Sequence, residues 1–167
     1  MLDLIIKNGS CYIDKNLNDQ DISIKDGKII EIGKIDKEAK EVFDAKGLTV
    51  LPGCIDTQTH FREPGSTDTE DLHSGSRAAI AGGITSVFEM PNTNPPTSNK
   101  LEFQKKLDLA KDRMYCNYAF YFGATANNAT ELAELKNLEG CCGIKLFAGS
   151  STGNLLVADE ADIEKVF

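Results

Sequence analysis

A change of pattern at Pro52-Gly53 constrains the fold of this chain more than any other feature of its sequence. Before it, runs of alternating apolar and polar residues at 21–25 and 28–33 flank the dipeptide Asp26-Gly27. Asp-Gly between two such runs is a strong hairpin signal. Asn8-Gly9 is a second turn signal, at the end of the first apolar run. Residues 1–50 are therefore predicted to form a small all-β unit.

After the change, apolar strands alternate with helical segments. Strands are predicted at 54–61, 85–90, 115–125 and 143–147, and helices at 72–81, 98–113, 130–138 and 159–167. Four alternations of this kind imply parallel strands in an α/β architecture. In the second helix, Ser98 is the expected N-cap, and Leu101, Leu107 and Leu109 are the expected apolar residues.

The length sets a limit on this α/β part. A (β/α)8 barrel takes around 250 residues, so residues 51–167 can supply only its first four βα units. Half a barrel would leave two strand edges unpaired. The expected fold is therefore the first half of a TIM-like barrel preceded by a small all-β unit, in a truncated chain.

Composition and charge narrow the class of protein. The net charge of −8 argues against nucleic acid and anionic membranes as partners, because both need a basic surface. An anionic small substrate remains compatible, because one arginine can hold a carboxylate. The sequence has no apolar run of about 18 residues, and its start resembles a strand more than a signal peptide. Its five irregularly spaced cysteines include no CxxC pair, so we expect reduced thiols and a cytoplasmic protein.

Polar residues gather at the predicted strand ends, where α/β barrels build their sites. Asp56, Gln58 and His60 alternate along the first strand and so share one face. Arg62 follows in the next loop, and Asn92 follows the second strand. Lys145 occupies an apolar strand, where a lysine is unfavourable to bury unless it is paired or modified.

Each of these residues also has a purely structural interpretation. His60 could be a satisfied structural histidine, and Arg62 with Glu63 could be a surface ion pair of little energetic weight. Asn92 could make an Asx-turn before the prolines, and Lys145 could extend its ammonium to the rim. Taken singly, these interpretations are favoured. Their positions on successive strand ends favour one common pocket.

Two motifs carry a resemblance to a known family. The segment 51–96, with His-Phe-Arg-Glu-Pro-Gly at 60–65 and Met-Pro-Asn-Thr-Asn-Pro at 90–95, closely resembles the dihydroorotase branch of the amidohydrolase superfamily. The segment 143–147 matches the strand on which many relatives carry a carboxylated lysine. Residues 1–50 resemble the β-sandwich part of a composite domain, and residues 51–167 the first four βα units of the barrel.

The resemblance implies a role for each candidate residue. His60 would bind a divalent metal beside the substrate, and Lys145, carboxylated, would be a catalytic residue that bridges two metal ions. The implied cofactor is zinc, as one or two divalent ions. Arg62 and Asn92 would hold the carboxylate of dihydroorotate. The implied reaction is metal-dependent hydrolysis or formation of the cyclic amide, between dihydroorotate and carbamoyl-aspartate, in pyrimidine biosynthesis. The remaining ligands and a proton-shuttling aspartate would lie outside this chain.

One departure keeps alternatives open. The family motif usually has histidine at the position of Gln58, and an amide oxygen is a weak zinc ligand. The alternatives are a non-catalytic scaffold partner of aspartate transcarbamoylase and a cyclic amidohydrolase of allantoinase or hydantoinase type. A homodimer is a further expectation, and His73 matches no motif and receives no role.

Overall fold

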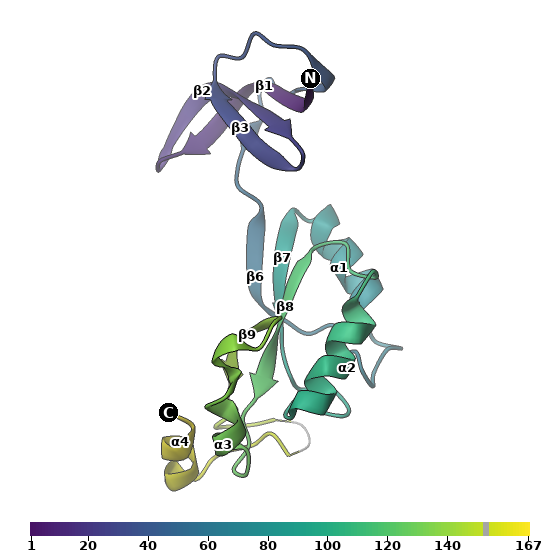
Figure 1. Ribbon diagram of the computed structural model, residues 1–167, viewed down its shortest axis with the longest axis vertical. Coiled ribbons are helices and arrows are strands. Elements are labelled where there is room, and N and C mark those ends of the chain that lie inside the picture. Colours follow the sequence, from purple (N-terminus) through teal and green to yellow (C-terminus); the bar gives the residue numbers. More distant parts are fainter. Residues whose placement is uncertain (152–153) are drawn as a thin grey trace. The chain divides into compact units, whose positions relative to one another are not determined.

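The computed structural model describes residues 1–151 and 154–167, and the chain divides into two compact units, Met1–Pro52 and Gly53–Phe167 (Figure 1). Within the described residues, no helix is long and apolar enough to cross a membrane. The first unit contains β1 (Leu2–Ile13), β2 (Asn16–Lys25), β3 (Lys28–Gly33), β4 (Ala39–Asp44) and β5 (Thr49–Val50). The second contains β6 (Cys54–Thr59), α1 (Leu72–Ala81), β7 (Ile84–Glu89), α2 (Lys100–Ala110), β8 (Asn117–Gly123), α3 (Ala129–Leu132), the 3-10 helix η1 (Leu135–Asn137), β9 (Cys141–Lys145) and α4 (Glu160–Val166).

The first unit is a mixed sheet built around β1. Its strand order is β3-β2-β1-β4, with β5 also paired to β1, and β4 and β5 run parallel to β1. The predicted hairpin is confirmed, because β2 and β3 pair antiparallel around Asp26 and Gly27. These two residues have φ angles of 51° and 70°, the positive values that a tight hairpin turn of type I′ needs.

The prediction of a turn at Asn8-Gly9 is wrong. β1 continues through both residues, and its register against β2 shifts between Ile6 and Gly9. Asn8 has a φ of 61°, so the left-handed preference of asparagine produces a bulge here instead of a chain reversal. A Cβ on Gly9 would lie 2.6 Å from Cγ2 of Val50, which explains a glycine where β1 pairs with β5.

The second unit is a parallel sheet with strands in sequence order, β6-β7-β8-β9, as expected for the first half of a (β/α)8 barrel. α1 packs against β7 and α2. The core between sheet and helices is aromatic. Phe103 of α2 lies 5.9 Å from the ring of Phe122 and 6.5 Å from that of Phe120, and all three side chains are buried.

The second helix differs in detail from its prediction. Asn99, not Ser98, is the N-cap, and its side chain accepts a hydrogen bond of 2.9 Å from the amide of Glu102. Leu101, expected to be an apolar packing residue, is 65% exposed. Leu107 and Leu109 are partly buried against the core, as expected. The buried residues of α2 are Phe103, Lys106 and Ala110.

The third helical segment, expected to be one helix over 130–138, consists of α3 followed by η1. Neither piece has a side-chain hydrogen bond at its N-cap. Helices of this length are marginal without external support, which accounts for the break.

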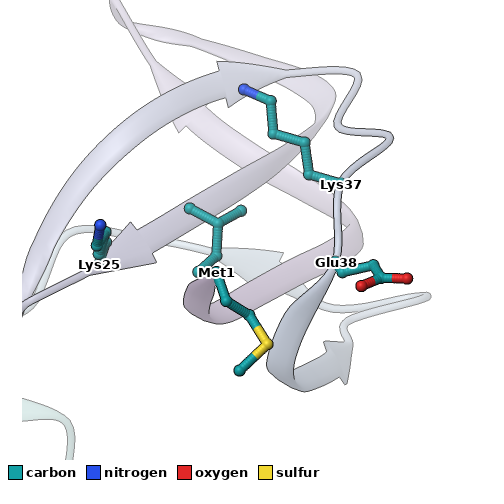
Figure 2. A pocket seen from close by; sticks show the side chains of 5 residues that line it. Met1, Lys25, Lys37 and Glu38 are labelled. Atoms are coloured by element: carbon teal, nitrogen blue, oxygen red, sulfur yellow. The ribbon is translucent and has the colours of Figure 1, made fainter.

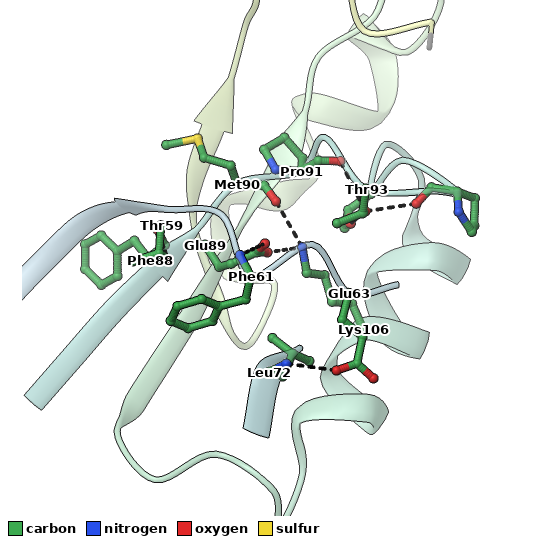
Figure 3. A network of polar contacts seen from close by, with 12 residues as sticks. Thr59, Phe61, Glu63, Leu72, Phe88, Glu89, Met90, Pro91, Thr93 and Lys106 are labelled. Atoms are coloured by element: carbon green, nitrogen blue, oxygen red, sulfur yellow. Dashed lines mark hydrogen bonds and ion pairs between the residues drawn. The ribbon is translucent and has the colours of Figure 1, made fainter. Parts of the chain in front are cut away.

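The loop after β6 is fixed by the buried carboxylate of Glu63. One of its oxygens accepts a 2.9 Å hydrogen bond from the amide of Leu72, the first residue of α1 (Figure 3). The same carboxylate binds both terminal nitrogens of Arg113, at 2.7 and 3.2 Å. Glu63 therefore does not form a surface pair with Arg62. It connects this loop to α1 and to the segment after α2.

Arg113→Met should destabilise the second unit by about 2 kcal/mol, less than for a fully buried pair because Arg113 is partly exposed. The change leaves the carboxylate of Glu63 buried with one backbone donor. Urea unfolding of the full-length protein measures the effect. Lys105→Met, which removes the exposed pair with Glu102, is the matched control and should change stability by less than about 0.5 kcal/mol. Equal effects of both substitutions would contradict this account.

Gly75→Ala should destabilise the protein although alanine favours helix by about 1 kcal/mol. A Cβ at Gly75 in α1 would lie 2.4 Å from the Phe61 ring, and overpacking of this kind costs about 1–3 kcal/mol. Thermal unfolding provides the measurement. Gly149→Ala, which meets open space, is the control, and a more stable Gly75→Ala protein would show that the Phe61 ring is free to move.

Candidate functional site

The candidate residues lie at the edge of the parallel sheet where the strands end. β6, β7 and β9 end at Thr59, Glu89 and Lys145. Thr59 and Glu89 are partners in the register, and the Met90 amide donates a 2.9 Å hydrogen bond to the Thr59 carbonyl. His60, Arg62 and Asn92, which follow these strands, therefore start from neighbouring positions on one edge.

Half-buried His60 is the centre of this group. Its side chain forms a hydrogen bond with Asn92, which raises its pKa. Burial is the largest influence and lowers the pKa of His60 below its usual range, and the positive charges of Arg62 and Lys145 lower it further. The other three predicted site residues, Arg62, Asn92 and Lys145, therefore all act on His60. A neutral imidazole at neutral pH is the form that binds a metal ion.

Arg62 and Lys145 are the two basic residues predicted for the site, and their local environments differ. Arg62 is half-buried and has a left-handed φ of 63°, an uncommon conformation for a long side chain. Lys145 is half-buried at the end of β9, and its Nζ lies 5.0 Å from the centre of the Phe147 ring. A lysine ammonium over an aromatic ring is an attractive arrangement, and here the ring belongs to a residue that follows β9.

Asp56 and Gln58 are exposed on β6. The Asp56 carboxylate accepts a 2.9 Å hydrogen bond from the Gln58 backbone amide. The side chain of Gln58 is thus accessible, and its amide offers only a neutral oxygen as a metal ligand.

A buried ion pair that the sequence analysis missed lies beside the edge residues. Glu89 and Lys106 form an ion pair, with 1% and 0% of their side chains exposed. Figure 3 shows the pair between the segments that begin at Thr59 and Met90. Burial raises the pKa of Glu89 to about 7, against the effects of Lys106 and the Phe61 amide, and burial lowers the pKa of Lys106.

Two sequence signals could have revealed this pair. Glu89 is an acidic residue at the end of an apolar strand, the same signal that singled out Lys145. Lys106 lies three residues after Phe103 and four before Ala110, which places it on the buried face of the helix.

The candidate residues fit part of a metal site. His60 offers one nitrogen donor, and Lys145 would offer anionic oxygens once carboxylated. In the part of the chain that the structure describes, no group of three or more His, Cys, Asp or Glu residues could hold a metal ion. Catalytic zinc sites use three protein ligands and an open position, so His60 and Lys145 would be two members of a larger ligand set.

The cysteines and the second histidine lie outside this group. All five cysteines belong to the described residues and are free thiols, as predicted. Burial raises the pKa of Cys142 to about 12, which makes it a poor nucleophile. His73 contacts the Tyr115 ring edge to face, with 5.1 Å between ring centres. A pocket in the first unit (Figure 2) contains none of the predicted site residues; it is lined by Met1, Leu2, Lys25, Lys37 and Glu38.

Comparisons with known proteins identify a family for this chain. Residues 49–155 match the model of the amidohydrolase family. A dihydroorotase from Methanosarcina mazei is 40% identical over 96% of this chain and 35% of its own length. An allantoinase from Escherichia coli O1:K1 is 41% identical over 89% of this chain and 33% of its own length. The chain therefore spans about a third of the length of these relatives.

Solved structures support the fold. The L-hydantoinase from Arthrobacter aurescens has a TM-score of 0.90 and 29% identity, over 99% of this chain and 38% of its own. A D-hydantoinase has a TM-score of 0.81 and 31% identity, over 98% of this chain and 36% of its own. These neighbours confirm the expected fold, an all-β unit followed by the first half of a (β/α)8 barrel. The chain belongs to the amidohydrolase family.

Proposed function

We propose that this chain contributes the first part of the active site of a metal-dependent dihydroorotase, which interconverts dihydroorotate and carbamoyl-aspartate in pyrimidine biosynthesis in the cytoplasm. The observation that supports the proposal is that His60, Arg62 and Asn92 follow β6 and β7, and Lys145 ends β9, on the C-terminal side of one parallel sheet. The remaining metal ligands would come from residues outside 1–167, as the greater length of the relatives suggests.

Positive charge at this edge favours an anionic substrate. Arg62, Lys145 and Lys106 all lower the pKa of His60, so a bound anion would relieve repulsion among groups that already lie close together. The guanidinium of Arg62 can hold a carboxylate through two parallel hydrogen bonds. Asn92 can add a donor through its amide nitrogen. Dihydroorotate carries such a carboxylate next to its cyclic amide.

Metal binding would involve His60 and carboxylated Lys145. A divalent ion such as zinc, when bound, polarises the amide carbonyl and activates water for its hydrolysis. This chain's own residues hold and orient the substrate. The lowered pKa of His60 keeps its imidazole unprotonated and free to act as a ligand at neutral pH.

Two other functions draw on specific observations. The names of the relatives include allantoinase and hydantoinase, so a different cyclic amide is the nearest alternative substrate. Gln58 favours a scaffold for aspartate transcarbamoylase, because loss of a ligand is tolerated in a chain that needs no catalysis. Retention of Arg62 beside His60 argues for catalysis. A homodimer remains a prediction in either case.

Arg62→Ala should lower kcat/KM for dihydroorotate about 30- to 100-fold, mostly through KM, because a charge-assisted contact with the carboxylate is lost. Steady-state kinetics of the full-length protein provide the measurement. Dihydrouracil, the same ring without the carboxylate, is the matched control substrate, and its kcat/KM should be nearly unchanged by the substitution. Undiminished hydrolysis of dihydroorotate by Arg62→Ala would disprove the clamp.

Gln58→His should raise the number of tightly bound zinc ions per chain in the full-length protein, because imidazole is a stronger zinc ligand than an amide oxygen. Metal analysis after dialysis gives the stoichiometry. Lys145→Ala should lower it, and Lys136→Ala, which removes a lysine outside the edge, should leave it as it is. Equal zinc content in the first variant and the parent protein would show that residue 58 does not limit metal binding.

A further inference from the structure

The ion pair Glu89–Lys106 joins the two segments that carry the candidate site residues. Glu89 Oε1 accepts a hydrogen bond of 3.2 Å from the amide of Phe61, the residue between His60 and Arg62. Lys106 Nζ donates a hydrogen bond of 3.0 Å to the carbonyl of Met90, two residues before Asn92. One buried pair therefore binds a backbone group in each of the two segments, the Phe61 amide after β6 and the Met90 carbonyl after β7 (Figure 3).

We propose that Glu89 and Lys106 are positioning residues that fix the spacing between the His60–Arg62 segment and Asn92, and so preform the substrate site. The proposal rests on the proposed function for its kinetic consequences only. The two charges act through backbone groups and do not themselves contact substrate in this account.

The hydrogen bond from the Phe61 amide to Glu89 matters because the next residue, Arg62, has a left-handed backbone conformation. Arg62 has a φ of 63° and follows directly on Phe61, whose amide is held by Glu89. On the other side, the side chain of Glu63 is held by Arg113 and the Leu72 amide. Both neighbours of Arg62 are thus anchored, and its uncommon conformation is maintained by groups around it.

A role in stability alone explains this pair poorly. Removing two charges from water is costly, and a well-packed apolar pair of similar volume is often as stable as a buried ion pair or more so. Lys106 also lies 5.0 Å from the centre of the Phe120 ring, among apolar core residues. What an apolar pair cannot reproduce is the acceptor for the Phe61 amide and the donor to the Met90 carbonyl.

The test compares two double variants of the full-length protein. Glu89→Leu/Lys106→Met replaces the pair by apolar groups and removes both backbone contacts. Glu89→Gln/Lys106→Met keeps an acceptor for the Phe61 amide but removes the donor to Met90. The exposed pair Lys100–Glu134, changed to methionine and leucine, is the matched control. Each protein is measured by chemical denaturation, by hydrogen exchange of a peptide containing Phe61, and by kinetics with dihydroorotate.

The expected result separates positioning from stability. The apolar variant should denature near the parental midpoint, yet exchange its Phe61 amide faster and lose about 100-fold in kcat/KM, mainly through KM. The glutamine variant should recover slow exchange at Phe61 but retain a raised KM. The control should match the parent in all three measurements.

The proposal would be overturned if the apolar variant folds and keeps the parental exchange rate at Phe61 and the parental KM. If that variant does not fold, the glutamine variant decides alone, because a parental KM without the donor to Met90 contradicts the positioning role. If the parent protein hydrolyses no dihydroorotate, the proposed function fails. The exchange of the Phe61 amide then still decides whether Glu89 holds this segment.

Discussion

Parallel pairing of β6, β7, β8 and β9 is the constraint on which the candidate site depends. Because neighbouring strands point the same way, their C-terminal ends lie at one edge, and residues far apart in sequence meet there. The register sets the details. Thr59 is level with Glu89, so the loops that carry His60 and Asn92 start side by side, and the two side chains form a hydrogen bond. Gly123 is level with Lys145, and a shift of one residue in β9 would turn Lys145 to the other face of the sheet.

Positive charge predominates around His60, because the buried acids of this region are already paired. Arg62, Lys106 and Lys145 all act on His60, and the buried acid among them, Glu89, is already paired with Lys106. Glu63, the other buried acid of this region, is occupied by Arg113. Each of these buried acids thus has its own basic partner, although the charge of Arg62 also acts on Glu89. Under the proposed function, Arg62 would face an external anion and Lys145, once modified, a metal ion. This division of acids and bases is a physical reason to favour a substrate with a carboxylate.

The sequence predicted the framework well and the contacts within it less well. Strand and helix alternation, the Asp26-Gly27 hairpin and the helix over 72–81 follow from local patterns, and the structure confirms them. Asn8-Gly9 shows the limit, because the same dipeptide that favours a turn also suits a bulge, and pairing with distant strands decides between them. Helix α2 shows another, because Ser98 and Asn99 are both residues that favour an N-cap, and local preference alone does not choose between them.

The site residues show the same division between local and long-range information. His60, Arg62 and Asn92 were predicted because they lie at or after the ends of apolar strands, and Lys145 because it occupies one. Lys106 was overlooked because a lysine in a helix is ordinarily a solvated residue, and its burial depends on Glu89 in a strand seventeen positions earlier. Neither charge would be tolerated in this core without the other. Each charge leaves a signal in its own element, but the pairing itself links a strand and a helix and follows from neither pattern alone, and under the proposed positioning role it determines where two separate loops present their side chains.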